Sequence, residues 1–129
     1  MEYTEIIATN TTPLILLNHQ GTIEIIGKCI PENSAEFWGR VQEWFFGYMK
    51  NPASHTTIII QIDYLNTSSS KELLHLLYNL NEMVQQGKTA EVKWYYYAED
   101  ADMKEVGKDY AHMLKVPFEI SEIKLEHII

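Results

Sequence analysis

The chain has 129 residues, of which 46% are hydrophobic and 22% charged, a composition that suits one compact domain with a core of ordinary size. Ten basic and eighteen acidic residues leave a net charge of −8, which disfavours binding to nucleic acid or anionic lipid. The single cysteine cannot form an internal disulfide, and we find neither a basic signal-peptide start nor an apolar run of the ~20 residues that span a membrane. We therefore expect a single domain over residues 1–129 that works in the cytoplasm.

The first part of the chain predicts strands. Residues 3–8 suit a short edge strand. Residues 13–17 and 22–26 flank the polar segment Asn18-His19-Gln20-Gly21, which ends in the glycine that tight turns favour. These two segments therefore predict an antiparallel hairpin.

A helix is expected next. Asn33, with Glu36 three residues later, resembles a capping box at a helix start, and Asn51-Pro52 ends the helix because proline disfavours helical backbone in the residue before it. Phe46 points away from the predicted core face and would suit a partner contact, although core packing explains most of the aromatic side chains here. The residues expected on the core face are Phe37, Val41, Trp44, Phe45 and Tyr48.

A buried strand and a second helix follow. Residues 56–65 form a near-continuous apolar run, typical of a strand that is covered on both faces. Apolar residues then recur at helical spacing until Gly87, which indicates a helix end. The residues on the predicted core face of this helix are Leu73, Leu76, Leu77, Leu80 and Val84.

The last part of the chain repeats this alternation. Residues 91–97 predict a strand, and a third helix begins near Asp100 and is ended by Pro117. Residues 118–120 predict a last strand before a tail of uncertain structure. The residues expected on the buried side of the third helix are Met103, Val106, Tyr110, Met113 and Leu114.

Strands that alternate with helices after an opening hairpin predict an α/β fold, a single-domain mixed sheet in which the hairpin is followed by βαβαβα(β). Right-handed crossovers send the outgoing loops of parallel strands to one edge of the sheet. We therefore expect residues 31–33, 66–70 and 98–100 to gather at the carboxyl edge, which is the predicted working surface.

Four hydroxyl side chains in a row mark the junction between the strand at 56–65 and its helix. They follow Asn66 and belong to Thr67, Ser68, Ser69 and Ser70. Ser and Thr are common N-caps, so capping is the simplest interpretation, but one cap satisfies only one or two amides. A phosphate attached at a helix start meets unpaired amides and a positive partial charge, so the junction also suits a phosphorylation switch.

Three segments in order give the chain a resemblance to a known family. They are Gly27-Lys28-Cys29-Ile30-Pro31-Glu32-Asn33-Ser34, Tyr64-Leu65-Asn66-Thr67-Ser68-Ser69 with Lys71, and Lys93-Trp94-Tyr95-Tyr96. With Phe37 and Trp44, they resemble the SiaC family of bacterial regulatory phosphoproteins, from the hairpin to Phe118. Members of that family look like distant relatives of the anti-sigma-factor antagonists, so the resemblance implies a STAS-like fold.

The resemblance also implies a partner switch that uses neither catalysis nor a cofactor. A kinase and a metal-dependent phosphatase would toggle one threonine, Thr67 by its place in the Leu-Asn-Thr-Ser-Ser segment. The unmodified form would bind and stimulate a diguanylate cyclase or a similar target in the control of biofilm formation and aggregation. Cys29 and Ile30 stand where Ser and Tyr are expected in this family. The residues expected to contact partners are Pro31, Glu32, Asn33, Leu65, Asn66, Ser68, Ser69 and Lys71.

The residues by themselves leave two other functions open. A small α/β enzyme or ligand-binding domain would use Asn66–Ser70 as an anion pocket, and a constitutive interaction module would use the same turn unmodified. Asp63 is placed to orient the Thr67 hydroxyl for a kinase or to hold a metal brought by the phosphatase, although a solvated aspartate is the simpler interpretation. The acidic residues in 99–102 lack the spacing of a calcium loop, and the histidines lack zinc-type spacing. Cys29 is expected to be a small buried or half-buried thiol.

Overall fold

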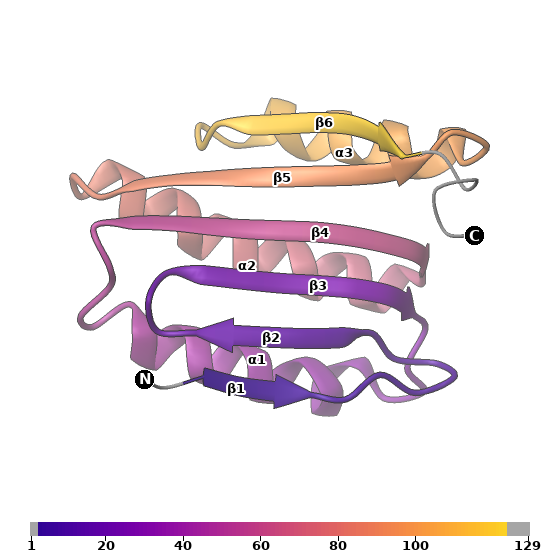
Figure 1. Ribbon diagram of the computed structural model, residues 1–129, viewed down its shortest axis with the longest axis horizontal. Coiled ribbons are helices and arrows are strands. Elements are labelled where there is room, and N and C mark those ends of the chain that lie inside the picture. The colour runs from indigo at the N-terminus through magenta and orange to yellow at the C-terminus, as the bar shows by residue number, and fades with distance from the viewer. Residues whose placement is uncertain (1–2, 124–129) are drawn as a thin grey trace.

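Six strands in sequence order form one mixed sheet, and the computed structural model describes residues 3–123 of the chain (Figure 1). The strands are β1 (Tyr3–Ile6), β2 (Leu14–Asn18), β3 (Thr22–Cys29), β4 (His55–Leu65), β5 (Thr89–Tyr97) and β6 (Phe118–Ile123). Strands β1 to β3 pair antiparallel, whereas β3 to β6 pair parallel. The predicted α/β class, the opening hairpin and the mixed sheet are therefore confirmed.

Within the described residues, three helices connect the parallel strands, namely α1 (Ser34–Tyr48), α2 (Thr67–Gln85) and α3 (Ala101–Met113). Figure 1 shows all three helices behind the sheet, on one face. Right-handed crossovers between neighbouring strands that advance in one direction place every helix on the same side. None of the helices in residues 3–123 is long and apolar enough to cross a bilayer.

This one-sided arrangement corrects the prediction that the strand at 56–65 is covered on both faces. Along β4, the buried side chains of Ile58, Ile60 and Ile62 alternate with the half-buried side chains of Ile59 and Gln61. The buried set faces the helices, and the alternating set faces away from them. The apolar run misled the prediction because Ile59 is as hydrophobic as its buried neighbours and yet lies on the open face.

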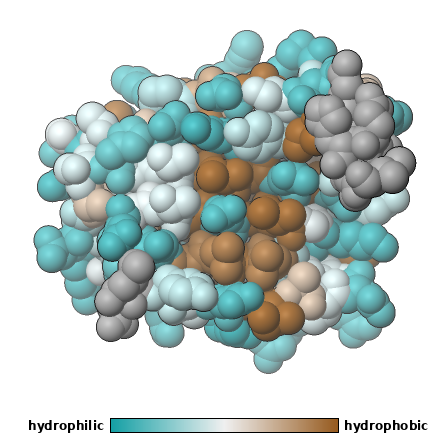
Figure 2. Space-filling model, in the orientation of Figure 1, coloured by the Kyte–Doolittle hydropathy of each residue, from teal (hydrophilic) through white to brown (hydrophobic). Residues whose placement is uncertain are grey.

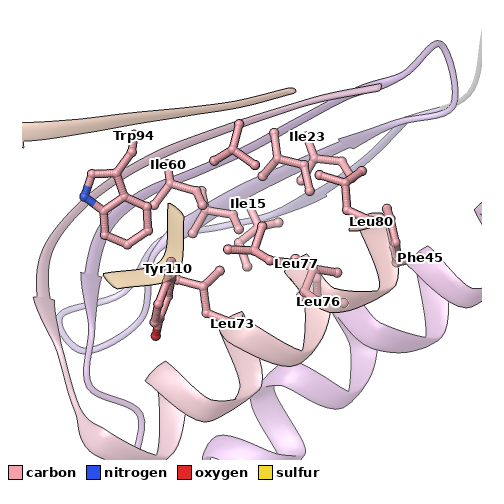
Figure 3. Packing of buried hydrophobic residues seen from close by; sticks show 14 of the residues in the cluster. Ile15, Ile23, Phe45, Ile60, Leu73, Leu76, Leu77, Leu80, Trp94 and Tyr110 are labelled. Carbon is pink, nitrogen blue, oxygen red and sulfur yellow. The ribbon is translucent and has the colours of Figure 1, made fainter. Parts of the chain in front are cut away.

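The core lies between the sheet and the helices. In Figure 3, isoleucines of the strands point toward leucines on one side of α2, while Phe45 of α1 and Tyr110 of α3 close the two ends of this layer. Trp94 of β5 is fully buried next to Tyr110, with their ring centroids 5.6 Å apart. The fully buried leucines of α2 are Leu73, Leu76, Leu77 and Leu80, all four on the predicted core face.

Two details of the helix faces differ from prediction. In α1, Trp38 is fully buried although it was not predicted on the core face, while Phe37 and Trp44 pack against the core as predicted and are half-buried. In α3, Met113 is 53% exposed, so its predicted place on the buried stripe is wrong. The helical period ends at Met113 because the backbone becomes extended at Leu114.

Three strand ends also differ from prediction. The first strand stops at Ile6, two residues short of the predicted end, and β3 continues to Cys29 beyond an irregularity in its pairing with β4. The last strand extends to Ile123, which pairs with Tyr97 of β5. The tail at residues 124–129 lies outside the described residues.

The packing of α3 against the sheet yields a stability prediction. A Cβ at Gly107 would lie 2.6 Å from the indole of Trp94, which is fully buried and donates from Nε1 to the Met103 carbonyl at 2.9 Å. Because that indole has no room to move, Gly107→Ala should lower the free energy of unfolding by about 1–3 kcal/mol in urea titrations.

The matched control is Gly39→Ala in α1, where no atom lies within 4 Å of the added Cβ. Alanine there should raise the free energy of unfolding by about 0.5–1 kcal/mol, since it forms helix better than glycine. Equal effects of the two substitutions would contradict the close approach of α3 to Trp94.

Candidate functional site

The junction between β4 and α2 is organised by Asn66, the N-cap of α2. Its side-chain oxygen accepts a hydrogen bond from the Ser69 amide at 3.0 Å, and its side-chain nitrogen donates to the Pro31 carbonyl at 3.2 Å. The Asn66 amide donates to the Cys29 carbonyl at 3.0 Å. The interpretation that a hydroxyl caps this helix is therefore wrong, because Asn66 makes the cap and also joins α2 to the segment that leads into α1.

Three of the four hydroxyls at the junction form hydrogen bonds with other groups of the protein. Ser68 Oγ lies 2.6 Å from Ser34 Oγ, and Ser70 Oγ donates to the Thr67 carbonyl at 2.9 Å. Ser69 Oγ accepts from the indole nitrogen of Trp38 at 3.0 Å. Thr67, the first residue of α2, is exposed, and its hydroxyl has no hydrogen-bond partner among residues 3–123.

The expectation that Ser69 contacts a partner must be corrected. Its side chain has no exposed surface, and Ser34 Oγ lies 3.1 Å from it, in addition to the bond from Trp38. The same correction applies to Pro31, which is buried and takes part through its carbonyl. Both residues hold the site together from inside, so neither presents its side chain to a partner in this conformation.

The other predicted partner residues surround Thr67. Glu32, Asn33, Ser68 and Lys71 are exposed, whereas Leu65 and Asn66 are half-buried. Their common position at the carboxyl ends of β3 and β4 confirms the prediction that these loops gather at one edge of the sheet. Whether they contact a partner stays a prediction.

Thr67 lies between two surface grooves at this edge. The first, which we call the helix-start groove, has a volume of about 680 Å³ and is lined by Glu32, Asn33, Ser34, Ala35, Thr67, Ser68, Lys71 and Glu72. The second, the acidic groove, has a volume of about 810 Å³ and is lined by Asp63, Tyr64, Leu65, Thr67, Ser70, Tyr97, Glu99, Asp100, Asp102, Met103 and Val106. A group attached to the Thr67 hydroxyl could therefore lie in either of two different environments.

The two grooves differ in charge. The helix-start groove contains the carboxylates of Glu32 and Glu72, but it also contains the Lys71 ammonium group and the first residues of α1 and α2, which carry positive partial charge. The acidic groove contains four carboxylates and, among its described lining residues, no Lys or Arg. Burial raises the pKa of Asp63, an effect that Lys28 opposes and the Asp100 carboxylate reinforces. An anion on Thr67 should therefore favour the helix-start side.

Two residues of the site were not predicted from the sequence. Ser34 and Trp38 lie in the first turns of α1, yet their side chains reach the hydroxyls of α2. Ser34 directly follows the N-cap Asn33, so a polar residue there looks like part of an ordinary helix start. Only its burial, at 6% exposure, distinguishes it from a surface serine.

The remaining candidates are a buried thiol, the acidic and histidine side chains considered for a metal, and an exposed aromatic ring. Cys29 is fully buried, as expected, and this burial raises the pKa of its thiol and keeps it protonated. Within residues 3–123, no group of three His, Cys, Asp or Glu side chains is arranged to hold a metal ion. Phe46 is 66% exposed and points away from the core, as predicted.

Comparison with known proteins identifies the family. A model of the SiaC family of regulatory phosphoproteins matches residues 6–123. Over 113 residues the chain is 29% identical to an uncharacterised protein of Pseudomonas aeruginosa, covering 87% of this chain and 90% of that protein. The fold is similar to solved SiaC of Pseudomonas aeruginosa, with a TM-score of 0.88, 29% identity and coverage of 95% and 100% of the two chains.

A second similar structure is a chain in the crystal structure of the diguanylate cyclase SiaD in complex with its activator SiaC, also from Pseudomonas aeruginosa. There the TM-score is 0.88 and the identity 28%, and the match covers 93% of this chain and 99% of that chain. The three segments on which the resemblance rested all fall inside the matched residues 6–123. The chain therefore belongs to the SiaC family of regulatory phosphoproteins.

Proposed function

We propose that this protein is a non-enzymatic signalling protein that switches partners through reversible phosphorylation of Thr67. The observation that carries the proposal is the state of the four hydroxyls, of which only that of Thr67 is both exposed and free of partners among residues 3–123. A kinase needs a hydroxyl that it can reach and that no neighbour holds. Membership in a family of regulatory phosphoproteins supports the same assignment.

A phosphate on Thr67 would be compatible with the folded state. It adds about −1.5 to −2 charges at the start of α2, where interaction with the helix dipole is worth up to about 2 kcal/mol. Lys71, one turn along the helix, lines the same groove and supplies a cation nearby. We therefore expect phosphorylation to change the surface of the protein without unfolding it.

The same phosphate would oppose docking of a partner on this edge. A dianion that must be taken out of water costs several kcal/mol unless the partner supplies a cation. The four carboxylates of the acidic groove add to the negative charge that a partner would meet. A net penalty of about 3 kcal/mol corresponds to roughly a hundredfold loss of affinity.

The partners follow from the family. The relative SiaC is described as an activator of the diguanylate cyclase SiaD, with which it forms a complex. We propose that the unmodified form of this protein likewise binds and stimulates a diguanylate cyclase or a similar target, and so controls biofilm formation or aggregation. A kinase and a metal-dependent phosphatase would act on Thr67 in the cytoplasm.

The first test compares the two states of Thr67. Calorimetric titration with a diguanylate cyclase from the same genome should give a dissociation constant roughly a hundredfold higher for protein phosphorylated at Thr67 than for unmodified protein. The reason is the desolvation of the phosphate at the interface. Equal affinities of the two forms would remove the mechanism.

The second test uses substitutions. Thr67→Ala should keep the partner and escape the kinase, whereas Thr67→Asp should imitate the modified state only in part, because a carboxylate carries less charge than a phosphate. Ser68→Ala serves as the control, since it removes a neighbouring exposed hydroxyl and should leave phosphorylation of Thr67 intact. Pull-downs and phosphate incorporation measure both effects. Loss of the partner in Thr67→Ala would count against the proposal.

A further inference from the structure

The face of the sheet that none of the helices in residues 3–123 covers carries a hydrophobic patch. Figure 2, which views this face, shows hydrophobic side chains gathered over the middle of the sheet and bordered by hydrophilic ones. The strand register places side chains from β2 to β5 side by side on this open face. Its half-buried hydrophobic residues include Leu14, Leu16, Ile26, Ile59, Tyr95 and Tyr97.

One row across the open face has a charge pattern that suits self-association. Glu24 of β3 pairs in register with Ile59 of β4, and Ile59 pairs with Lys93 of β5. A carboxylate and an ammonium group therefore flank one isoleucine, and two strand spacings separate them by about 10 Å. Neither Glu24 nor Lys93 forms an ion pair within residues 3–123, although Lys93 has Glu119 of β6 as its register partner on the outer side of the row.

We propose that the open face is the interface of a homodimer, in which a second copy of this chain packs sheet against sheet. A two-fold axis that lies in the interface, parallel to β4 and level with Ile59, would stack Ile59 on Ile59 of the second copy. It would also place Glu24 of each copy opposite Lys93 of the other. Each dimer would then contain two matching contacts between opposite charges.

The alternative two-fold axis in the interface, perpendicular to the strands, gives the opposite result. It would set Glu24 on Glu24 and Lys93 on Lys93, so like charges would face each other across an apolar layer. Both axes keep the strands of the two sheets aligned, as is common when two sheets pack face to face, so charge alone selects the axis along the strands. In the row beyond, Ile26 of one copy would face Tyr95 of the other.

This dimer leaves the carboxyl edge of the sheet open and does not depend on the proposed role of Thr67. A two-fold axis along the strands keeps the strand direction of both copies the same. The two Thr67 side chains would therefore lie at the same end of the assembly, so that a dimeric target could contact both.

The test is a charge exchange read by sedimentation of the full chain. Wild type should be a dimer. Glu24→Lys and Lys93→Glu should each raise the dissociation constant of the dimer at least about tenfold, because each turns both contacts into like-charge pairs. An equimolar mixture of the two variants should dimerise again, since the lysine introduced into one variant then faces the glutamate introduced into the other.

Two controls keep the result interpretable. Far-UV circular dichroism checks that each variant is folded, and Phe46→Glu changes an exposed hydrophobic residue that lies on α1, away from the open face. Phe46→Glu should dimerise like wild type. A wild type that stays monomeric at every concentration, as it would if a different protein covers this face, overturns the proposal. Charge variants that dimerise like wild type, or a mixture that stays monomeric, also overturn it.

Discussion

The site depends on the side chain of Asn66, which forms hydrogen bonds in two directions. Its oxygen caps α2, while its nitrogen reaches the Pro31 carbonyl in the segment that leads into α1. Because an amide side chain has both a donor and an acceptor, one residue joins two helix starts at the same edge of the sheet. Because Asn66 makes the cap, the Thr67 hydroxyl is not needed for it and has no hydrogen-bond partner among residues 3–123. An oxygen-only cap such as aspartate would hold α2 but would lack the donor for Pro31.

Most of the fold could be predicted from the sequence because local patterns and topology agree. The hairpin turn at Asn18–Gly21, the cap at Asn33 and the leucine spacing of α2 each specify one element, and parallel strands joined by right-handed crossovers then bring their outgoing loops to one edge of the sheet. The coverage of the sheet was not predictable from hydrophobicity, since Ile59 on the open face looks like Ile58 and Ile60 beneath the helices. That ambiguity has a physical meaning if a second copy covers the open face.

The position of the site could be predicted, but which of its hydroxyls are hydrogen-bonded and which is free could not. Parallel strands bring their outgoing loops to one edge, which is enough to place residues 66–70 beside residues 31–33. Which hydroxyl stays free depends on Ser34 and Trp38, more than 30 positions earlier in the chain, whose side chains occupy Ser68 and Ser69. No local sequence pattern predicts such contacts, because they form only when α1 packs against α2. The predicted serines therefore divide into structural and exposed groups only in three dimensions.

In the proposed switch, one charge changes the surface of a stable scaffold. The central claim is that this charge is placed on Thr67 and on no other hydroxyl of the junction. Phosphopeptide mass spectrometry of the protein isolated from its native cells, across growth conditions, tests this claim most directly. Fragment ions should place the phosphate on Thr67 in a fraction of molecules that varies with conditions. Phosphate found on a neighbouring serine instead, or no modification under any condition, would contradict it.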